Sequence, residues 1–212
     1  MVNTALEDCA RDAGIVLSGS VIAVPRARRA ALVERLLAGR HWVHADVIAG
    51  SYLGQEGVLA GEIPALAAAA GPRLDIHLMV DELKAAIDAL PRGIGRVTIQ
   101  CPPGGELGDL VDQARGKAPS VWIALDDPSP TTVARALAAE ADGILAMLTP
   151  PGQPGYAADL GRLGRIRGAI GARVPLGVDG GVNEALIEQL KAAGVVYAVA
   201  GRALVNAVTE VP

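Results

Sequence analysis

Short apolar runs rich in β-branched residues alternate along the chain with longer segments whose apolar residues recur at helical spacing. The short runs predict eight β-strands, at 15–18, 42–47, 74–80, 96–101, 121–126, 143–148, 175–179 and 197–201. The longer segments predict helices at 27–38, 63–70, 82–90, 106–115, 131–139, 158–170 and 184–193. Residues 1–13 are expected to add a helix before the first strand.

The strands are apolar on both faces and helical segments separate them, which predicts a parallel sheet covered by helices. Eight such units that close on themselves form a TIM barrel, the (β/α)₈ fold. Because no linker or low-complexity stretch divides the chain, we expect a single TIM-barrel domain over residues 1–212, with the helix at 1–13 outside the barrel. An open doubly wound sheet is the main alternative, but no Gly-x-Gly-x-x-Gly motif follows the first strand.

Histidine and aspartate interrupt the apolar pattern of several expected strands. His44 shares one face of its strand with Asp46, and Asp75 shares a face with His77, because side chains two residues apart point to the same side. Asp179 ends a later strand, and the carboxyl ends of barrel strands carry the chemistry of this fold. Two histidines with carboxylates form a metal-ligand set. In the simpler alternative, each of these side chains caps or pairs locally.

Composition narrows the classes of partner. Aromatic residues make up 2% of the chain and the net charge is −4, so neither base stacking nor a basic surface supports nucleic-acid binding. No apolar run reaches the length of about 18 residues that a membrane span needs, and the polar N-terminus is unlike a signal peptide. The two isolated cysteines, Cys9 and Cys101, are typical of reduced thiols, so a cytoplasmic location is expected.

Four segments, WVHADVIAG, DIHLMV, MLTPPGQPGY and VDGGVN, occur in an order and spacing that resemble the ribulose-phosphate 3-epimerase family. The resemblance extends over about residues 15–206. It implies a TIM barrel, a cytoplasmic enzyme of the isomerase class and one divalent metal ion, commonly zinc, iron, manganese or cobalt. The four metal ligands of the family match His44, Asp46, His77 and Asp179. Homo-oligomers are frequent in the family, so a homo-oligomer is a further implication.

The same resemblance implies a reaction and a substrate. The family inverts the carbon next to the ketone of a pentulose phosphate, interconverting ribulose 5-phosphate and xylulose 5-phosphate. A proton leaves one face of that carbon and another is added to the opposite face, which requires two acid–base groups. The resemblance assigns these roles to Asp46 and Asp179, acting on an enediolate whose charge a divalent cation stabilises. Residues expected to contact the sugar phosphate are Ser18, Met79, Met147, Gly152, Gly155, Gly180, Gly181, Gly201 and Arg202.

The four residues that match the metal ligands are all retained, but the positions that would recognise the sugar and its phosphate depart from the family pattern. These positions are Ile15, Ile48, Ala49, Ser51, Gln100, Gln153, Pro154 and Arg202. A proline in the phosphate loop removes one backbone N–H donor. Arg202 supplies a guanidinium that can bind an anion in a forked geometry, and the alternative is that it points to solvent. The sequence therefore marks a divergent member of the family.

Four functions remain open at this point. They are the pentulose-phosphate epimerase, an epimerase with the same mechanism on another keto-sugar, a non-catalytic relative that binds a metabolite or a partner protein, and a related lyase. The related lyases carry an Asp-x-Lys motif on the third strand. His77 stands where their lysine would be, so the lyase is the least favoured of the four functions.

Overall fold

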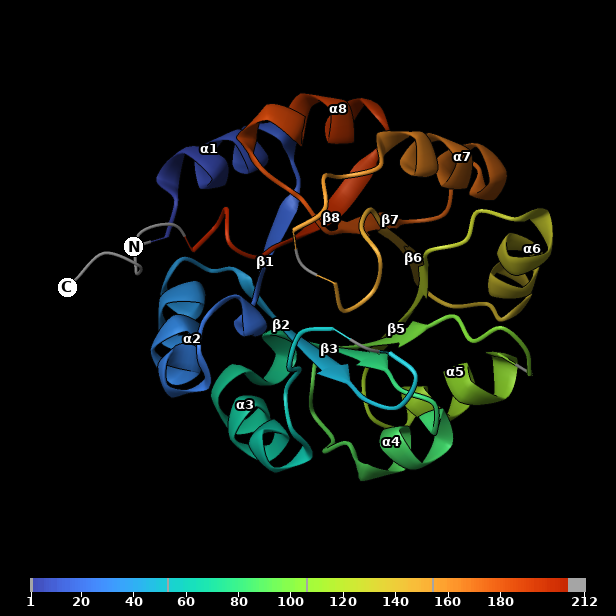
Figure 1. Cartoon of the computed structure of the whole chain (residues 1–212), viewed down its shortest axis with the longest axis horizontal. Coiled ribbons are helices and arrows are strands. Elements are labelled where there is room, and N and C mark those ends of the chain that lie inside the picture. The colour runs from blue at the N-terminus through green and yellow to red at the C-terminus, as the bar shows by residue number, and fades with distance from the viewer. Residues whose placement is uncertain (1, 53, 106, 154, 206–212) are drawn as a thin grey trace.

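Eight parallel strands close into a barrel in the order in which they occur along the chain (Figure 1). The computed structural model describes residues 2–52, 54–105, 107–153 and 155–205. Glu106, where a helix is expected to begin, and Pro154 of the expected phosphate loop lie outside the described residues, as do residue 206, where the resemblance ends, and Met1. The strands are β1 (Val16–Ser20), β2 (Trp42–Ile48), β3 (Leu74–Met79), β4 (Arg96–Gln100), β5 (Ser120–Leu125), β6 (Gly143–Met147), β7 (Leu176–Asp179) and β8 (Val195–Ala200).

A ring of helices surrounds the barrel (Figure 1). They are α1 (Thr4–Ala13), α2 (Arg29–Ala38), α3 (Ile63–Ala70), α4 (Leu83–Ala89), α5 (Leu107–Arg115), α6 (Pro130–Ala138), α7 (Leu160–Ile170) and α8 (Ile187–Ala192). The expected TIM barrel is therefore confirmed. Helix α1 lies where the sequence predicts an additional N-terminal helix, and it packs against β1 and α8. No helix in the described part of the chain is long and apolar enough to cross a bilayer.

Local sequence signals set several helix ends. The side chain of Asn3 accepts hydrogen bonds from two backbone N–H groups at the start of α1, and Gly14 ends that helix in the left-handed conformation. Ser129 caps α6, which begins at Pro130, a residue suited to the first helical turn. One boundary bears on the site: β1 extends to Ser20, two residues beyond the expected end, and so brings Ser20 beside His44 of β2.

Two cores lie on the two sides of the strand wall. Aliphatic side chains between the barrel and the helices form the larger core. A smaller cluster contains Trp122, Ala124, Leu145, Met147, Tyr197 and Val199, all from β5, β6 and β8. Strands β1 to β4 instead contribute the buried polar side chains Ser18, Ser20, His44, Asp46, Asp75, His77, Arg96, Thr98 and Gln100. The inside of the barrel is therefore polar along β1 to β4 and apolar along β5, β6 and β8.

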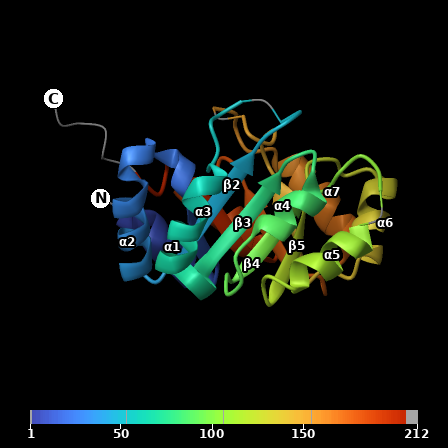
Figure 2. The ribbon, with the colours of Figure 1, turned by 90° about the horizontal axis from the view of Figure 1, so that it is seen from below.

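The loops after β2 and β6 meet above the barrel. The backbone N–H of Gln55 donates to the carbonyl of Gly152 over 2.8 Å. Figure 2 shows the loop after β2 rising above the carboxyl ends of the strands. This contact places both loops at the entrance to the barrel.

Candidate functional site

The four candidate metal ligands converge at the carboxyl end of the barrel. His44 and Asp46 come from β2, His77 from β3 and Asp179 from the end of β7. One ligand atom from each lies within 4.8 Å of the others. The two histidines are fully buried and the side chain of Asp46 is 7% exposed, whereas that of Asp179 is 16% exposed. The candidate ligand set from the sequence is thus assembled at one point.

The register between β2 and β3 creates this arrangement. His44 lies beside Asp75, and Asp46 lies beside His77, so histidine and aspartate alternate both along each strand and across the pair. Within the cluster, Nε2 of His44 is 3.0 Å from Oδ1 of Asp46, and Nδ1 of His77 is 3.3 Å from the same oxygen. Oδ2 of Asp179 approaches from the opposite wall, at 3.8 Å from His44 Nε2 and 4.0 Å from His77 Nδ1.

The remaining ring nitrogens of the two histidines have their own partners. Nδ1 of His44 lies 3.2 Å from Oδ2 of Asp75, and Nε2 of His77 lies 3.2 Å from Oε1 of Gln100. Gln100 in turn donates through Nε2 to Asp126 over 3.0 Å, which fixes the direction of its amide. A ring that donates its outer N–H to such a partner presents an unprotonated nitrogen to a metal. Both rings are therefore oriented as metal ligands.

The donor set fits a divalent cation. Four nitrogen and oxygen ligands around an ion at roughly 2.0–2.1 Å would lie about 3.3 Å apart. Each histidine nitrogen lies 3.0 to 4.0 Å from the aspartate oxygens, and all four atoms lie within 4.8 Å of one another, so small shifts of the side chains would enclose an ion. Imidazole with carboxylate suits zinc, iron, manganese and cobalt alike. His44, Asp46, His77 and Asp179 can thus hold one ion.

Charge pairing within the protein is the alternative use of the same cluster. Burial alone lowers the pKa of His44, but the charges of Asp46 and Asp75 outweigh it and raise the pKa well above its ordinary value. A protonated His44 can donate to Asp46 without any ion present. Metal uptake by the purified protein separates these two arrangements.

The two aspartates of the cluster have opposite proton affinities. Burial opposes ionisation of Asp46, but charge interactions and hydrogen bonds with His44 and His77 hold its pKa far below the usual range. Burial together with the negative charge of Asp46 raises the pKa of Asp179 to about 6. Two carboxyl groups whose environments separate their pKa values are suited to acting as base and acid.

This difference predicts a pH dependence of stability in the metal-free protein. Because the pKa of Asp179 is raised on folding, its contribution to stability is complete below about pH 4 and is lost as pH rises through about 6. Asparagine mimics the neutral carboxyl group, so Asp179→Asn should raise the free energy of unfolding by about 1–3 kcal/mol at pH 8. The gain should disappear below pH 4. Urea titrations of both proteins with chelator present measure the difference, and equal values at every pH would contradict it.

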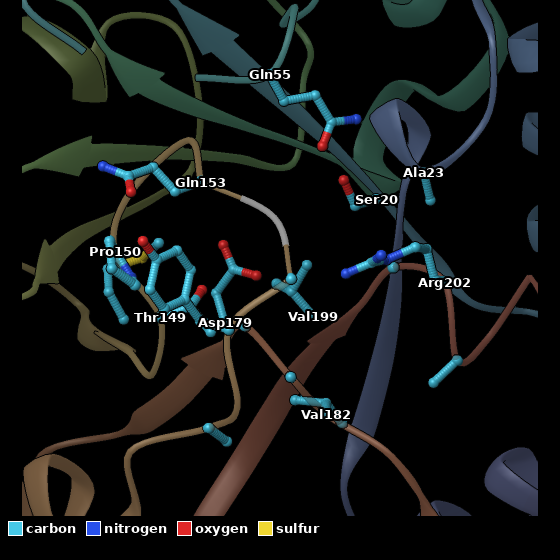
Figure 3. A pocket seen from close by; sticks show the side chains of 18 of the residues that line it. Ser20, Ala23, Gln55, Thr149, Pro150, Gln153, Asp179, Val182, Val199 and Arg202 are labelled. Atoms are coloured by element: carbon cyan, nitrogen blue, oxygen red, sulfur yellow. The ribbon is translucent and has the colours of Figure 1, made fainter. Parts of the chain in front are cut away.

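A cavity of about 710 Å³ opens above the cluster, between the loops that follow β1, β2 and β6 to β8. Figure 3 shows Asp179 near its centre, with Arg202 extending toward it from the side on which Ser20 also lies, and with Gln153 and Thr149 on the other side. This volume is in the range of small-molecule sites. Among the residues expected to contact substrate, those that line the cavity are Met79, Met147, Gly152, Gly155, Gly180, Gly181, Gly201 and Arg202.

Ser18 has a different position from these residues. It is fully buried in the barrel, beside Trp42 and Val199, and is not among the residues that line the cavity. Ser20, two residues further, lines the cavity and donates to Oδ2 of Asp46 over 2.9 Å. The sequence offered a signal for it, since Ser18 and Ser20 share a face of the strand. Gln55, Thr149 and Asn183 also line the cavity without having been expected.

The turn after β7 brings backbone close to the cavity. Gly180 and Gly181 have φ angles of +104° and +69°, and a Cβ atom on Gly180 would lie 2.3 Å from Oγ1 of Thr149. Only glycine fits such a turn at low cost. Arg202 lines the cavity nearby, and its side chain makes no hydrogen bond or ion pair with the residues that the structure describes. This end of the cavity therefore combines exposed backbone with a free cation.

Comparison with known proteins identifies a family and a curated relative whose sequences are similar to this chain. The model of the family described as "Ribulose-phosphate 3 epimerase family" matches residues 16–205. A curated ribulose-phosphate 3-epimerase from Rhodobacter capsulatus is 26% identical over 167 residues, which cover 77% of this chain and 73% of that protein.

Solved structures share the fold. A 3-hexulose-6-phosphate synthase superposes with a TM-score of 0.60 at 24% identity, covering 92% of this chain and 93% of the other. A phosphoribosyl anthranilate isomerase from Thermus thermophilus gives a TM-score of 0.57 at 13% identity, covering 88% and 86%. At these identities the similarity indicates a common barrel architecture.

Proposed function

The chain belongs to the ribulose-phosphate 3-epimerase family, and from this membership we propose that it is a metal-dependent epimerase of a pentulose phosphate. The proposed reaction interconverts ribulose 5-phosphate and xylulose 5-phosphate by inverting the carbon next to the ketone. One observation carries the proposal: Asp46 and Asp179 reach the floor of the same cavity from opposite walls of the barrel, and the pKa of Asp179 lies above that of Asp46.

The residues of the cluster divide the chemistry between them. Asp46, held ionised, removes the proton from one face of the carbon, and Asp179 delivers a proton to the other face. The roles exchange in the reverse direction. His44, Asp46, His77 and Asp179 would hold a divalent cation, which would supply Lewis-acid stabilisation of the negative charge on the carbonyl oxygen of the substrate. Met79 and Met147, which are almost fully buried at the cavity floor, exclude water from the reacting carbon.

The phosphate is proposed to bind at the end of the cavity formed by Gly180, Gly181, Gly201 and Arg202. Backbone N–H groups of late barrel loops suit an anion there. The free guanidinium of Arg202 adds a charge-assisted contact.

The direct test is to add ribulose 5-phosphate to the metal-loaded protein and to measure xylulose 5-phosphate. Phosphorylated and unphosphorylated hexuloses in parallel reactions distinguish an epimerase with the same mechanism on another keto-sugar. If no keto-sugar in the panel exchanges its proton with deuterated solvent, the proposal fails and a non-catalytic role is favoured.

Replacement of Arg202 tests the phosphate end. Arg202→Ala should weaken the binding of phosphorylated substrate by about 1.5–3 kcal/mol, the range for a hydrogen bond to a charged group, which corresponds to a rise in KM of roughly 10- to 150-fold. Arg165→Ala is the matched control, because Arg165 is an exposed arginine of α7 that pairs with Asp159. An unchanged KM in Arg202→Ala would exclude the phosphate contact.

A further inference from the structure

An arginine lies inside the barrel beneath the metal-ligand cluster. Arg96 begins β4, and its side chain is 9% exposed. Its Nη1 atom is 3.6 Å from Oδ2 of Asp75, which is fully buried. Nε and Nη1 have no hydrogen-bond partner among the described residues. A buried cation of this kind is costly unless its surroundings compensate for the lost water.

Three aromatic rings supply that compensation. The guanidinium carbon lies 4.0 Å from the ring centre of Trp122, 4.2 Å from that of Tyr197 and 4.8 Å from that of Trp42. These are both tryptophans of the chain and one of its three tyrosines, so most of its few aromatic residues surround one cation. Gly143 leaves the space for the indole, because a Cβ there would lie 2.5 Å from Trp122. Cation–π attraction is strongest when the cation is desolvated in this way.

Asp75 connects this arginine to the cluster. Thr98 donates to its Oδ1 and the hydroxyl of Tyr197 to its Oδ2, both over 2.8 Å. The same Oδ2 lies 3.2 Å from Nδ1 of His44. Tyr197 therefore contacts both Arg96 through its ring and Asp75 through its hydroxyl.

We infer that Arg96 is a positioning residue for the metal centre: it holds Asp75 as the fixed acceptor of the Nδ1–H of His44, so that Nε2 faces the ion. This inference rests on the proposed metal-dependent function. The geometry supports a role beyond filling the barrel floor, because Arg96 is the one lysine or arginine paired with Asp75 among the described residues, and the other charge partner of Asp75 is His44 itself. Without Arg96, the buried carboxylate of Asp75 would lose its one permanently charged partner among the described residues, and the ionised form that accepts from His44 would be less favoured.

The test compares Arg96→Met, which keeps an unbranched side chain but removes the charge, with the wild-type protein. The apparent affinity for Co²⁺ alone is measured by competition with a chelator. We expect it to fall by about 10- to 100-fold, as for other partners of metal-binding histidines. In the metal-free protein, the downfield proton resonance of His44 Nδ1–H, assigned with His44→Gln, should be lost. Arg96→Lys should give an intermediate affinity, since lysine restores the charge without the planar fork.

Arg167→Met is the matched control for loss of a structural arginine. Arg167 binds four carbonyl groups, including Gly171 and Ala193, and contacts no member of the cluster. It should reduce stability and leave Co²⁺ affinity and the His44 resonance unchanged. Wild-type affinity and an intact resonance in Arg96→Met would overturn the inference and assign Arg96 to stability alone.

Two other results of these experiments also have a defined interpretation. If Arg96→Met does not fold, Arg96→Lys decides: weaker Co²⁺ binding supports the inference and wild-type binding overturns it. If the wild-type protein itself takes up no Co²⁺, the proposed metal-dependent function fails. The His44 resonance of the metal-free variants then still decides whether Arg96 positions that ring.

Discussion

Asp46→Asn and Asp179→Asn are each expected to lower kcat for epimerisation by about 10²- to 10⁴-fold, the range for removal of a positioned general acid or base. The physical reason is geometric. The two carboxyl groups reach the cluster from β2 and β7 on opposite walls, and an amide at either position can neither take up nor release the proton. The measurement is the initial rate with each isomer of the substrate.

Solvent isotope exchange separates loss of one base from loss of the whole site. In each variant one carboxylate remains, so exchange of the C3 proton with deuterated solvent should survive for one substrate isomer at most. Metal content, measured on the same samples, separates loss of proton transfer from loss of the ion. Asp81→Asn is the control, because Asp81 accepts hydrogen bonds from Ser51 near the barrel mouth but does not line the cavity. Full activity in either site variant would exclude the two-base mechanism.

Removal of the metal should abolish turnover and also lower stability. An ion that binds only the folded protein adds about 4 kcal/mol to the free energy of unfolding when its free concentration is 1,000 times Kd. For a chain of this size, that corresponds to a rise in Tm of roughly 8–16 °C. Calorimetry of chelator-treated protein, before and after addition of each candidate ion, measures the shift and the recovery of activity.

The three histidines of the chain provide matched variants for this experiment. His77→Gln removes one candidate ligand and should lose most of the stabilisation by metal. His41 pairs with Glu7 of α1, away from the cluster, so His41→Gln should show the same rise in Tm as the wild-type protein. Equal shifts in the two variants would place the ion elsewhere.

The periodicity of the sequence was sufficient to predict the barrel and the position of every strand to within two residues. The candidate ligand set was also predictable, because histidine and aspartate two residues apart on apolar strands are costly to bury without a common partner. Membership of the epimerase family, inferred from short segments, is confirmed by the match over residues 16–205.

Other features depend on packing that the sequence pattern does not contain. The end of β1 decides that Ser20 rather than Ser18 lines the cavity, and strand ends are the least certain part of such predictions. The pairing of Asp75 with Arg96 joins strands β3 and β4 through side chains whose contact requires the register between them. The aromatic residues around Arg96 come from three separate strands, and only barrel closure brings them together.

The alternation of acid and base between β2 and β3 has a consequence for how the barrel assembles. If β3 slipped by one residue, its histidine and aspartate would turn toward the helices. If it slipped by two, Asp46 would face Asp75 or His44 would face His77, so like charges or two bases would be buried together. Misaligned pairings are thereby penalised whichever way the strand moves. The side chains proposed for catalysis thus also favour the correct register between β2 and β3 when the barrel folds.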